Sequence, residues 1–216
     1  MVVKMFAKIN CKMIYGRSAR TLALLFFFAV CLSGCQSFDY VSTRPLDEAG
    51  FGYSSIQDLR ALDLNKAEVA ELVKAKSGGV AEQTCIDLLR EARSRKQRFT
   101  TGAEVSQLRS AGVGDSAILE LVRLNQLGPW TGDSEAISLA GISDRVVVAV
   151  ARRRSVGKVV LSGASLTRLK NAGVGEPALY ELAMRGITDA DATQIAVGRR
   201  KRGVTDAMVL RAYPAR

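Results

Sequence analysis

The chain has 216 residues, with 31 lysines and arginines against 21 acidic residues, and a formal net charge of +10. It contains no histidine, which excludes the commonest general base, the commonest metal ligand and the usual partner of a nucleophilic serine. The sequence has no metal motif, phosphate-binding loop or nucleophile elbow, so we expect no cofactor, no metal and no catalytic activity.

The first 35 residues are organised as a targeting segment. The run from Leu22 to Leu32 is apolar but too short for a membrane-spanning helix, which takes about 20 residues. It ends in Leu32-Ser33-Gly34-Cys35. No acidic residue occurs before Cys35, and the segment carries five basic residues: Lys4, Lys8, Lys12, Arg17 and Arg20.

This order of basic region, apolar run and Leu-Ser-Gly-Cys resembles the signal peptide and lipobox of bacterial lipoproteins. The resemblance implies cleavage before Cys35, a lipid on its sulfur and an acylated amino group, so that one partner of the chain is membrane lipid. Gln36 stands where an Asp would favour the inner membrane, so the resemblance implies an outer-membrane protein that faces the periplasm. An ordinary secretory signal and an uncleaved membrane anchor are the alternatives.

The lipoprotein interpretation divides the chain into three parts. We expect a signal peptide over 1–34, a lipidated cysteine with a flexible tether over 35–53, and a helical repeat domain over 54–216. The tether is predicted because its residues include Ser, Thr, Pro and Gly without a helical period. Of the four cysteines, two would leave with the signal and one would carry lipid, so an intramolecular disulfide is not expected.

Six times the chain has the pattern Gly, then Val or Ile, then any residue, then Asp or Glu. Successive copies begin 33, 29, 32, 13 and 17 residues apart, and the last two steps together span 30. A period of about 30 residues is typical of stacked helical units. The copies begin at Gly79, Gly112, Gly141, Gly173, Gly186 and Gly203.

Each tetrad is predicted to join two short helices. Its glycine suits the left-handed position just past a helix end, and its aliphatic residue staples the turn to the next helix. The third residue is the N-cap, with Ser143, Thr188 and Thr205 as strong caps. The acid then opens the helix and complements its dipole by roughly 0.3–1 kcal/mol. The expected staple partners are Cys85, Ile118, Val147, Leu179, Ala192 and Val209.

A second kind of helix start precedes several tetrads. Thr101 and Glu104 form a capping-box pattern, Asn65 opens an earlier helix in the same style, and residues 162–169 repeat the pattern of 101–108. Residues 130–140 are a shortened version. We therefore predict an all-α fold of nine or ten short helices in hairpins, with second helices over 82–97, 115–126, 144–154 and 176–185.

The tetrads resemble the Ala-Gly-Val-Ser-Asp-x-Val-Ile helical repeats of bacterial envelope lipoproteins of unassigned function. The most similar copies are residues 111–115 and 172–176, and the likeness covers residues 65–212. The resemblance implies an architecture and no activity. Because helical repeats bind partners on a shared face, we expect a non-catalytic binding or scaffolding protein in the cell envelope.

An alternative is a membrane-tethered DNA-binding protein. The helix-hairpin-helix motif also places Gly-hydrophobic-Gly between two short helices, where backbone amides hold a phosphate. The pairs Gly112/Gly114 and Gly173/Gly175 resemble that core. Against this hypothesis, an acid follows the second glycine of each pair and would repel phosphate, and the other four tetrads lack the second glycine.

Two basic clusters are candidate contacts for an anionic partner, which would be a protein, an anionic lipid or lipopolysaccharide, or a nucleic acid. Residues 35–140 carry 12 basic and 15 acidic side chains, whereas residues 141–216 carry 14 basic and 6 acidic ones. The alternative is that both clusters are solvated C-terminal turns of helices, where cations favour the dipole. The clusters are Arg152, Arg153 and Arg154, and Arg199, Arg200, Lys201 and Arg202.

Two further residues have a structural and a functional interpretation. Cys85 falls on a staple position, so a small buried apolar role is favoured over a reactive thiol. Trp130 follows a Gly-Pro turn, and we expect it to pin a linker against the core rather than to anchor a partner.

Overall fold

A computed structural model describes residues 41–199 and 203–214, and Cys35 and the predicted signal lie outside these ranges. Within them the fold is all-α: thirteen helices and no strand, which confirms the predicted class and exceeds the nine or ten helices expected. The helices are α2 (Arg44–Glu48), α3 (Tyr53–Arg60), α4 (Lys66–Ser77), α5 (Glu82–Ser94), α6 (Gly102–Ser110), α7 (Asp115–Arg123), α8 (Leu127–Thr131), α9 (Ser134–Ala140), α10 (Asp144–Ser155), α11 (Gly163–Asn171), α12 (Glu176–Arg185), α13 (Asp189–Arg199) and α14 (Asp206–Ala212).

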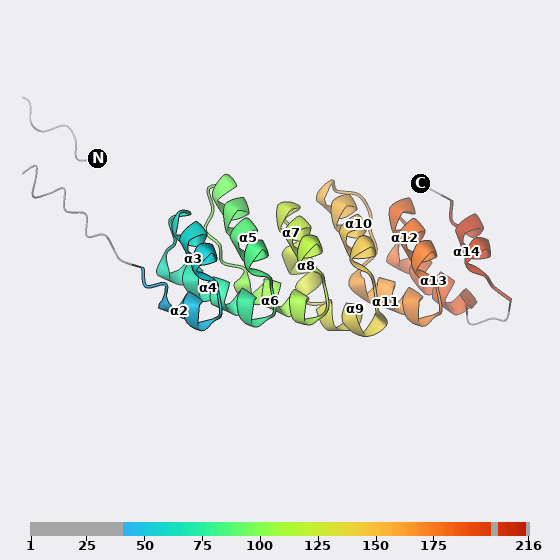
Figure 1. The fold of residues 1–216 in the computed structure, drawn as a ribbon. Helices are drawn as coiled ribbons and strands as arrows, with labels where there is room; N and C mark the ends of the chain where they lie inside the picture. The colour runs from blue at the N-terminus through green and yellow to red at the C-terminus, as the bar shows by residue number, and fades with distance from the viewer. Residues whose placement is uncertain (1–40, 200–202, 215–216) are drawn as a thin grey trace, which may run out of the picture. The chain divides into compact units, whose positions relative to one another are not determined.

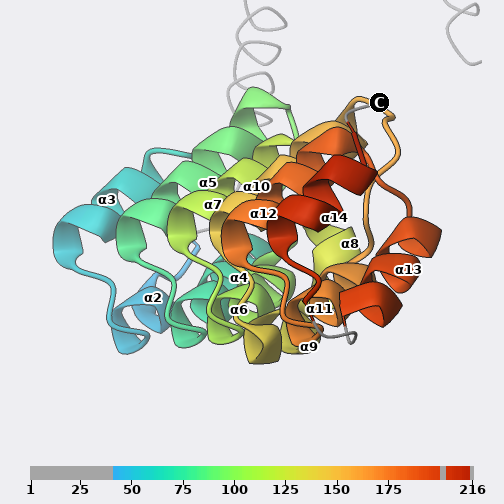
Figure 2. The same cartoon turned by 90° about the vertical axis from the view of Figure 1, so that its right-hand side faces the viewer.

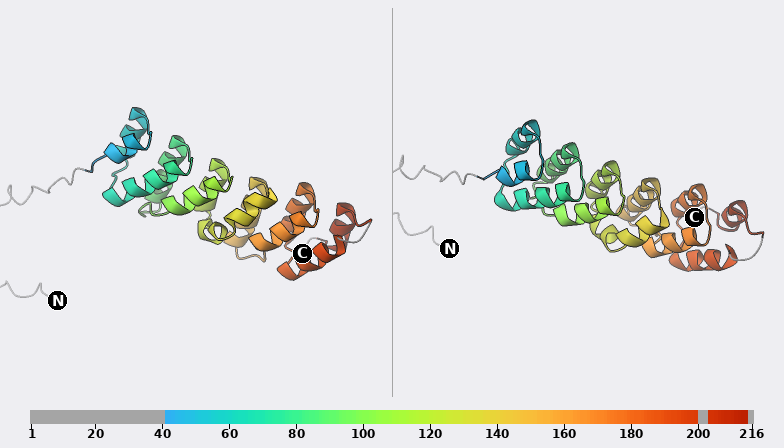
Figure 3. Two further views of the ribbon diagram at one scale, coloured as in Figure 1. Left: turned by 90° about the horizontal axis from the view of Figure 1, so that it is seen from below. Right: turned by 60° about the horizontal axis from the view of Figure 1, so that its bottom comes forward.

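The helices form two layers of successive hairpins (Figure 1). In the second layer, α3, α5, α7, α10, α12 and α14 pack side by side, each against the next (Figure 2). In the first layer, α2, α4, α6 and α8 follow one another, and α9, α11 and α13 continue the row (Figure 3). Each layer therefore repeats one helix per period of about 30 residues.

The six tetrads form the predicted turns. All six glycines have positive φ, for example +88° at Gly79 and +90° at Gly112, which is a conformation that side chains disfavour. Five tetrads lie inside hairpins, between a first-layer helix and a second-layer helix. The tetrad at Gly186 instead joins α12 to α13, and so links two successive hairpins.

The predicted staple partners are buried, and the predicted caps are confirmed in part. Val113 and its partner Ile118 are both buried, as are the other five predicted partners. Thr205 accepts a hydrogen bond from the N–H of Met208, and Thr188 accepts one from the N–H of Asp191. Ser143 and Thr101 occupy the N-cap positions of α10 and α6 as predicted, but their side chains make no such bond.

The folded unit starts earlier than the sequence predicted. The expected tether over 35–53 overlaps α2, and Leu46 and Phe51 are buried in the core. These two side chains supply an apolar face that is too short to show a helical period in the sequence. The lower boundary of the repeat unit therefore lies near Val41.

The fourth hairpin departs most from the repeat. Its first-layer segment is divided into α8 and α9, where the sequence predicted one shortened helix. Trp130 in α8 is fully buried, so it belongs to the core and is not exposed to anchor a partner. Cys85 is also fully buried, and burial raises the pKa of its thiol to about 12, which confirms the structural interpretation.

One carboxylate is buried inside the array. Glu68 in α4 accepts hydrogen bonds from both terminal nitrogens of Arg93, at 2.7 and 2.8 Å, and from the N–H groups of Asn65 and Phe99. Burial alone would raise the pKa of Glu68, but the hydrogen bonds outweigh it and lower the pKa to about 2. Glu68 therefore stays ionised inside the fold.

Candidate partner-binding surface

The acid of each tetrad inside a hairpin connects that hairpin to the one before it. Its carboxylate accepts a hydrogen bond from the N-cap N–H of the preceding second-layer helix. This satisfies a donor that a helix start leaves free, and it places negative charge at two helix N-termini. The five N···O pairs are Gly52–Glu82 at 2.9 Å, Ala81–Asp115 at 2.8 Å, Gly114–Asp144 at 3.0 Å, Ser143–Glu176 at 3.0 Å and Gly175–Asp206 at 3.0 Å.

We call these five bonds the carboxylate ladder. Four of its acids also form an ion pair with a cation from the first-layer helix of their own hairpin: Lys76–Glu82, Arg109–Asp115, Lys170–Glu176 and Arg199–Asp206. Asp144 has no ion pair within the described residues, because Ser138 stands where the other hairpins carry the cation.

The ladder occupies the amides that a helix-hairpin-helix motif would offer to phosphate. The N–H groups of Gly114 and Gly175 donate to Asp144 and Asp206. A Cβ at Gly114 would lie 2.4 Å from Oδ2 of Asp144, so the glycine leaves room for that carboxylate. Gly112 and Gly173 are the turn residues with positive φ. The geometry of these candidate turns supports contacts between hairpins and does not favour a phosphate site.

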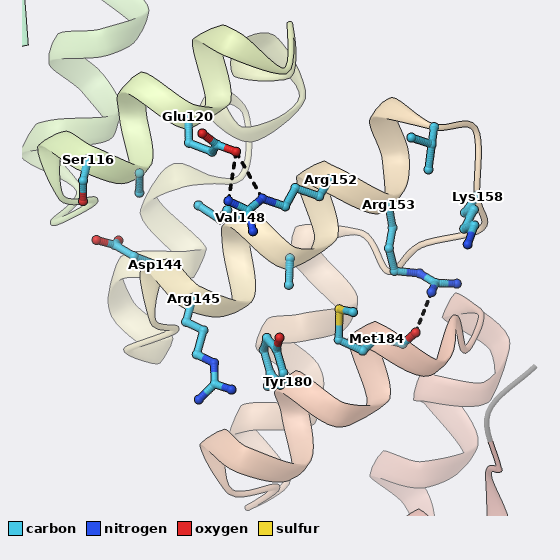
Figure 4. Close-up of a pocket in the computed structure, with 13 residues that line it drawn as sticks. Ser116, Glu120, Asp144, Arg145, Val148, Arg152, Arg153, Lys158, Tyr180 and Met184 are labelled. Atoms are coloured by element: carbon cyan, nitrogen blue, oxygen red, sulfur yellow. Dashed lines mark hydrogen bonds and ion pairs between the residues drawn. The ribbon is translucent and has the colours of Figure 1, made fainter.

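The three arginines of the first basic cluster point to three different places. Arg152 pairs with Glu120 of α7 at 3.0 Å, and Arg153 donates to the carbonyl oxygen of Met184 in α12 at 2.5 Å (Figure 4). Arg154 turns inward, and its guanidinium lies 5.2 Å from the ring centre of Trp130.

Burial lowers the pKa of Arg154, although the charges of nearby carboxylates oppose the shift. The three side chains therefore do not form one exposed patch.

The second basic cluster is described only at its first residue. Arg199 donates to the carbonyl oxygens of Gly173 and Val204 and pairs with Asp206. It therefore joins two hairpin turns. Arg200, Lys201 and Arg202 lie outside the described residues.

A groove lies on the outer face of the second layer, over α10 and between α7 and α12 (Figure 4). Its volume is about 630 Å³. Arg145 stands over the ring of Tyr180, with its guanidinium 4.0 Å from the ring centre, and Lys158 lies at the opposite end, beside Arg153. Val148 and Ala149 lie between these two ends.

The groove arises because α10 differs from the other second-layer helices at two outward positions. Its sixth residue is Ala149, where α5, α7 and α12 carry Asp87, Glu120 and Glu181. The small side chain leaves a depression between the neighbouring helices and removes a negative charge. The second residue of α10 is Arg145, whereas the same position in α7 is Ser116.

The sequence predicted Arg152 and Arg153 as contacts but missed the rest of this site, because its residues come from three helices. If the second-layer helices that begin with an acid are aligned at that residue, α10 has Ala149 at the sixth position, where α5, α7 and α12 have an acid.

Arg145 and Lys158 are the uncommitted charges of the groove. Neither forms an ion pair or a side-chain hydrogen bond in the described part of the chain, whereas Arg152 is paired with Glu120 and Arg153, which also lacks a carboxylate partner there, donates to the carbonyl oxygen of Met184. Asp144 also lines the groove, but its carboxylate is engaged by the N–H of Gly114. The groove therefore offers two cations, one at each end, around an apolar centre.

The chain matches no model of a known protein family, and a search of curated proteins finds no similar sequence. None of the helices in residues 41–199 and 203–214 combines the length and apolar character needed to span a membrane. The same residues contain no group of three or more Cys, Asp or Glu side chains placed to hold a metal ion.

Proposed function

We propose that this chain is a non-catalytic lipoprotein of the cell envelope that binds an anionic partner through its helical repeat surface. Its lipid anchor would be Cys35, and its place would be the outer membrane, facing the periplasm. The observation that carries the binding role is the groove over α10, where Arg145 and Lys158 have no carboxylate partner among the described residues. Cations without a partner, beside apolar side chains, are available to an anionic one.

The carboxylate ladder supports the same assignment. The tetrad acids inside the hairpins, which are the recurrent polar feature of the chain, are engaged in contacts between hairpins. They are therefore structural groups. The role left for the protein is the one that stacked hairpins commonly have, which is to present a rigid surface.

The lipid anchor rests on the lipobox and on the chemistry that it implies. Each buried methylene contributes about 0.8 kcal/mol to membrane binding, so several acyl chains on one cysteine hold a protein firmly. Mass spectrometry of the protein from its own cells tests this point. We expect a mature N-terminus at Cys35 that carries acyl chains, and a Cys35→Ser variant that leaves the membrane fraction. An intact, unacylated N-terminus would overturn the anchor.

The binding role is tested by pull-down with the lipidated chain as bait, at low and at high salt. An anionic partner held by exposed cations is expected to dissociate as salt is raised, because screening shortens the reach of such charges to about 8 Å at physiological ionic strength. A complex that is recovered equally at low and at high salt and that needs only residues 54–140 would contradict the proposal.

A further inference from the structure

We propose that the groove over α10 binds an acidic segment of another protein, one that carries apolar residues between its carboxylates. The inference rests on the proposed binding function and specifies its surface and the chemistry of its partner. The groove runs along α10. Arg145, Val148 and Arg152 follow one another at spacings of three and four residues, so they share one face of α10, and the C-cap residue Val156 continues the row.

The length of that face suits a short peptide segment. The eleven steps from Arg145 to Val156 would rise about 17 Å along a helix axis at 1.5 Å per residue. The α12 side of the groove is formed by Tyr180 and Met184, one helical turn apart. A partner lying along α10 would therefore contact both neighbouring helices over about three turns.

The apolar lining of the groove is partly open to solvent. Val156 is 67% exposed and Met184 is 41% exposed, whereas Ala149 at the bottom is 6% exposed. Tyrosine, methionine and arginine are the residue types enriched in protein interfaces. Burying these side chains under a partner would remove apolar surface from water, at about 25 cal/mol per Å².

The charges favour a protein segment over a phosphate group. Tight phosphate sites converge several donors on one point. Here Arg145, Arg152 and Arg153 diverge toward Tyr180, Glu120 and the Met184 carbonyl, respectively. Glu120 also lines the groove and would repel a dianion placed at its centre. Two separate cations at the ends instead match two separate carboxylates on one peptide.

The test is photo-crosslinking in the cells that produce the protein, with the full chain and a photoreactive phenylalanine derivative in place of Val156. The crosslinked peptide is then sequenced. We expect a protein segment with carboxylates on both sides of apolar residues. We expect the adduct yield to fall about tenfold when Arg145→Glu and Lys158→Glu are combined, which corresponds to about 1.4 kcal/mol of binding free energy.

A matched control separates this effect from net charge. Lys66→Glu combined with Arg211→Glu changes the charge equally, at two exposed cations outside the groove, and is expected to leave the yield unchanged. Circular dichroism shows that each variant is folded. An adduct with lipid, with a second copy of this chain or with a segment that lacks carboxylates would overturn the inference, as would equal yields in the two double variants.

A second crosslinking position distinguishes this inference from the proposed function. Val197 is 58% exposed on the first layer and lines a separate depression between α11 and α13. Protein adducts at Val197 without adducts at Val156 would overturn the groove assignment and leave a binding role on another face. If neither position yields a protein adduct, both the groove and the binding role are contradicted.

Discussion

Hairpin α4–α5 and hairpin α9–α10 each enclose one charged side chain, but only the first surrounds it with opposite charge. The side chain of Glu68 is 1% exposed and pairs with Arg93 and Arg98. Arg154 packs over Trp130, has no carboxylate within ion-pair distance in the described residues, and leaves one terminal nitrogen without a hydrogen-bond partner. The same backbone repeat therefore holds a neutralised charge in one place and an unneutralised one in the other.

This contrast extends to the two halves of the array. The acidic half pairs most, though not all, of its cations with carboxylates, through Arg93, Arg95 and Arg109 among others. In the basic half, Arg145 and Lys158 find no carboxylate among the described residues. The comparison indicates that the first half is organised for stability and that the second half leaves charge available for a partner.

The largest effect is expected from Glu68→Gln. This change leaves Arg93 half-buried without its carboxylate, and breaking a buried ion pair from one side costs roughly 3–5 kcal/mol. Urea unfolding followed by the fluorescence of Trp130, which is the sole tryptophan, measures the loss. Glu104→Gln is the matched control, because that side chain forms no ion pair in the described residues, and it should cost under about 0.5 kcal/mol. Equal stability of the two variants would show that the Glu68 network contributes nothing.

The Glu68 network also predicts that the stability of the fold depends on pH. The pKa of Glu68 falls from its usual 4.5 to about 2 in the folded chain. A carboxyl group whose pKa is lowered by folding contributes stability that is fully present above its unfolded pKa and is lost as the pH falls through the folded value. The free energy of unfolding should therefore decline between pH 4.5 and 2, and less steeply in Glu68→Gln. Parallel curves for the two proteins would argue against this account.

Removing a carboxylate of the ladder is expected to lower the stability of the fold by an intermediate amount. The loss should be larger in the acidic half than in the basic half. Asp115 accepts bonds from the N–H of Ala81 and from the hydroxyl of Thr84, and it pairs with Arg109. Among the residues that the structure describes, Asp144 accepts only from the N–H of Gly114. We expect Asp115→Ala to cost about 2–3 kcal/mol and Asp144→Ala about 1–2 kcal/mol, since charge-assisted bonds stabilise most. Thermal unfolding ranks the two variants, and the reverse order would contradict the assignment.

The smallest effect is expected from Arg154→Met. Arg154 is partly buried and has no ion pair among the described residues, and replacing such a charge with an apolar side chain of similar length is often neutral or stabilising. We expect a change within about 1 kcal/mol, together with a shift in the emission of Trp130, because the guanidinium lies over its ring. A loss as large as that of Glu68→Gln would show that Arg154 has a stabilising partner, and the contrast between the two hairpins would fail.

The turns could be predicted from the sequence because their physics is local. Gly112 takes its left-handed conformation, and Val113 and Ile118 are both buried, within a span of seven residues. The ladder could not be predicted in this way, because Asp144 binds Gly114 across a separation of 30 residues. The sequence showed an acid at the start of one helix and a glycine before another. Neither feature identifies the residue to which it is hydrogen-bonded.

The candidate site was predicted in its charge and in part of its lining. The excess of basic residues after residue 140 was visible, and the predicted cluster contributes Arg152 and Arg153 to the lining of the groove, whereas its third residue, Arg154, turns toward Trp130. The three side chains of the cluster diverge because successive helical residues point about 100° apart, toward α7, α12 and the core. The groove instead depends on the register of α10 between two neighbours, which only the packed structure provides.

Amide hydrogen exchange at Gly114 and Gly175 tests the central claim most directly, because the account assigns both N–H groups to carboxylates of the next hairpin. We predict that both amides exchange slowly in the native chain, and that Asp144→Ala speeds exchange at Gly114 while leaving Gly175 protected. Fast exchange at both glycines in the native protein would contradict the ladder and return these turns to the amides open for phosphate that a DNA-binding hairpin needs.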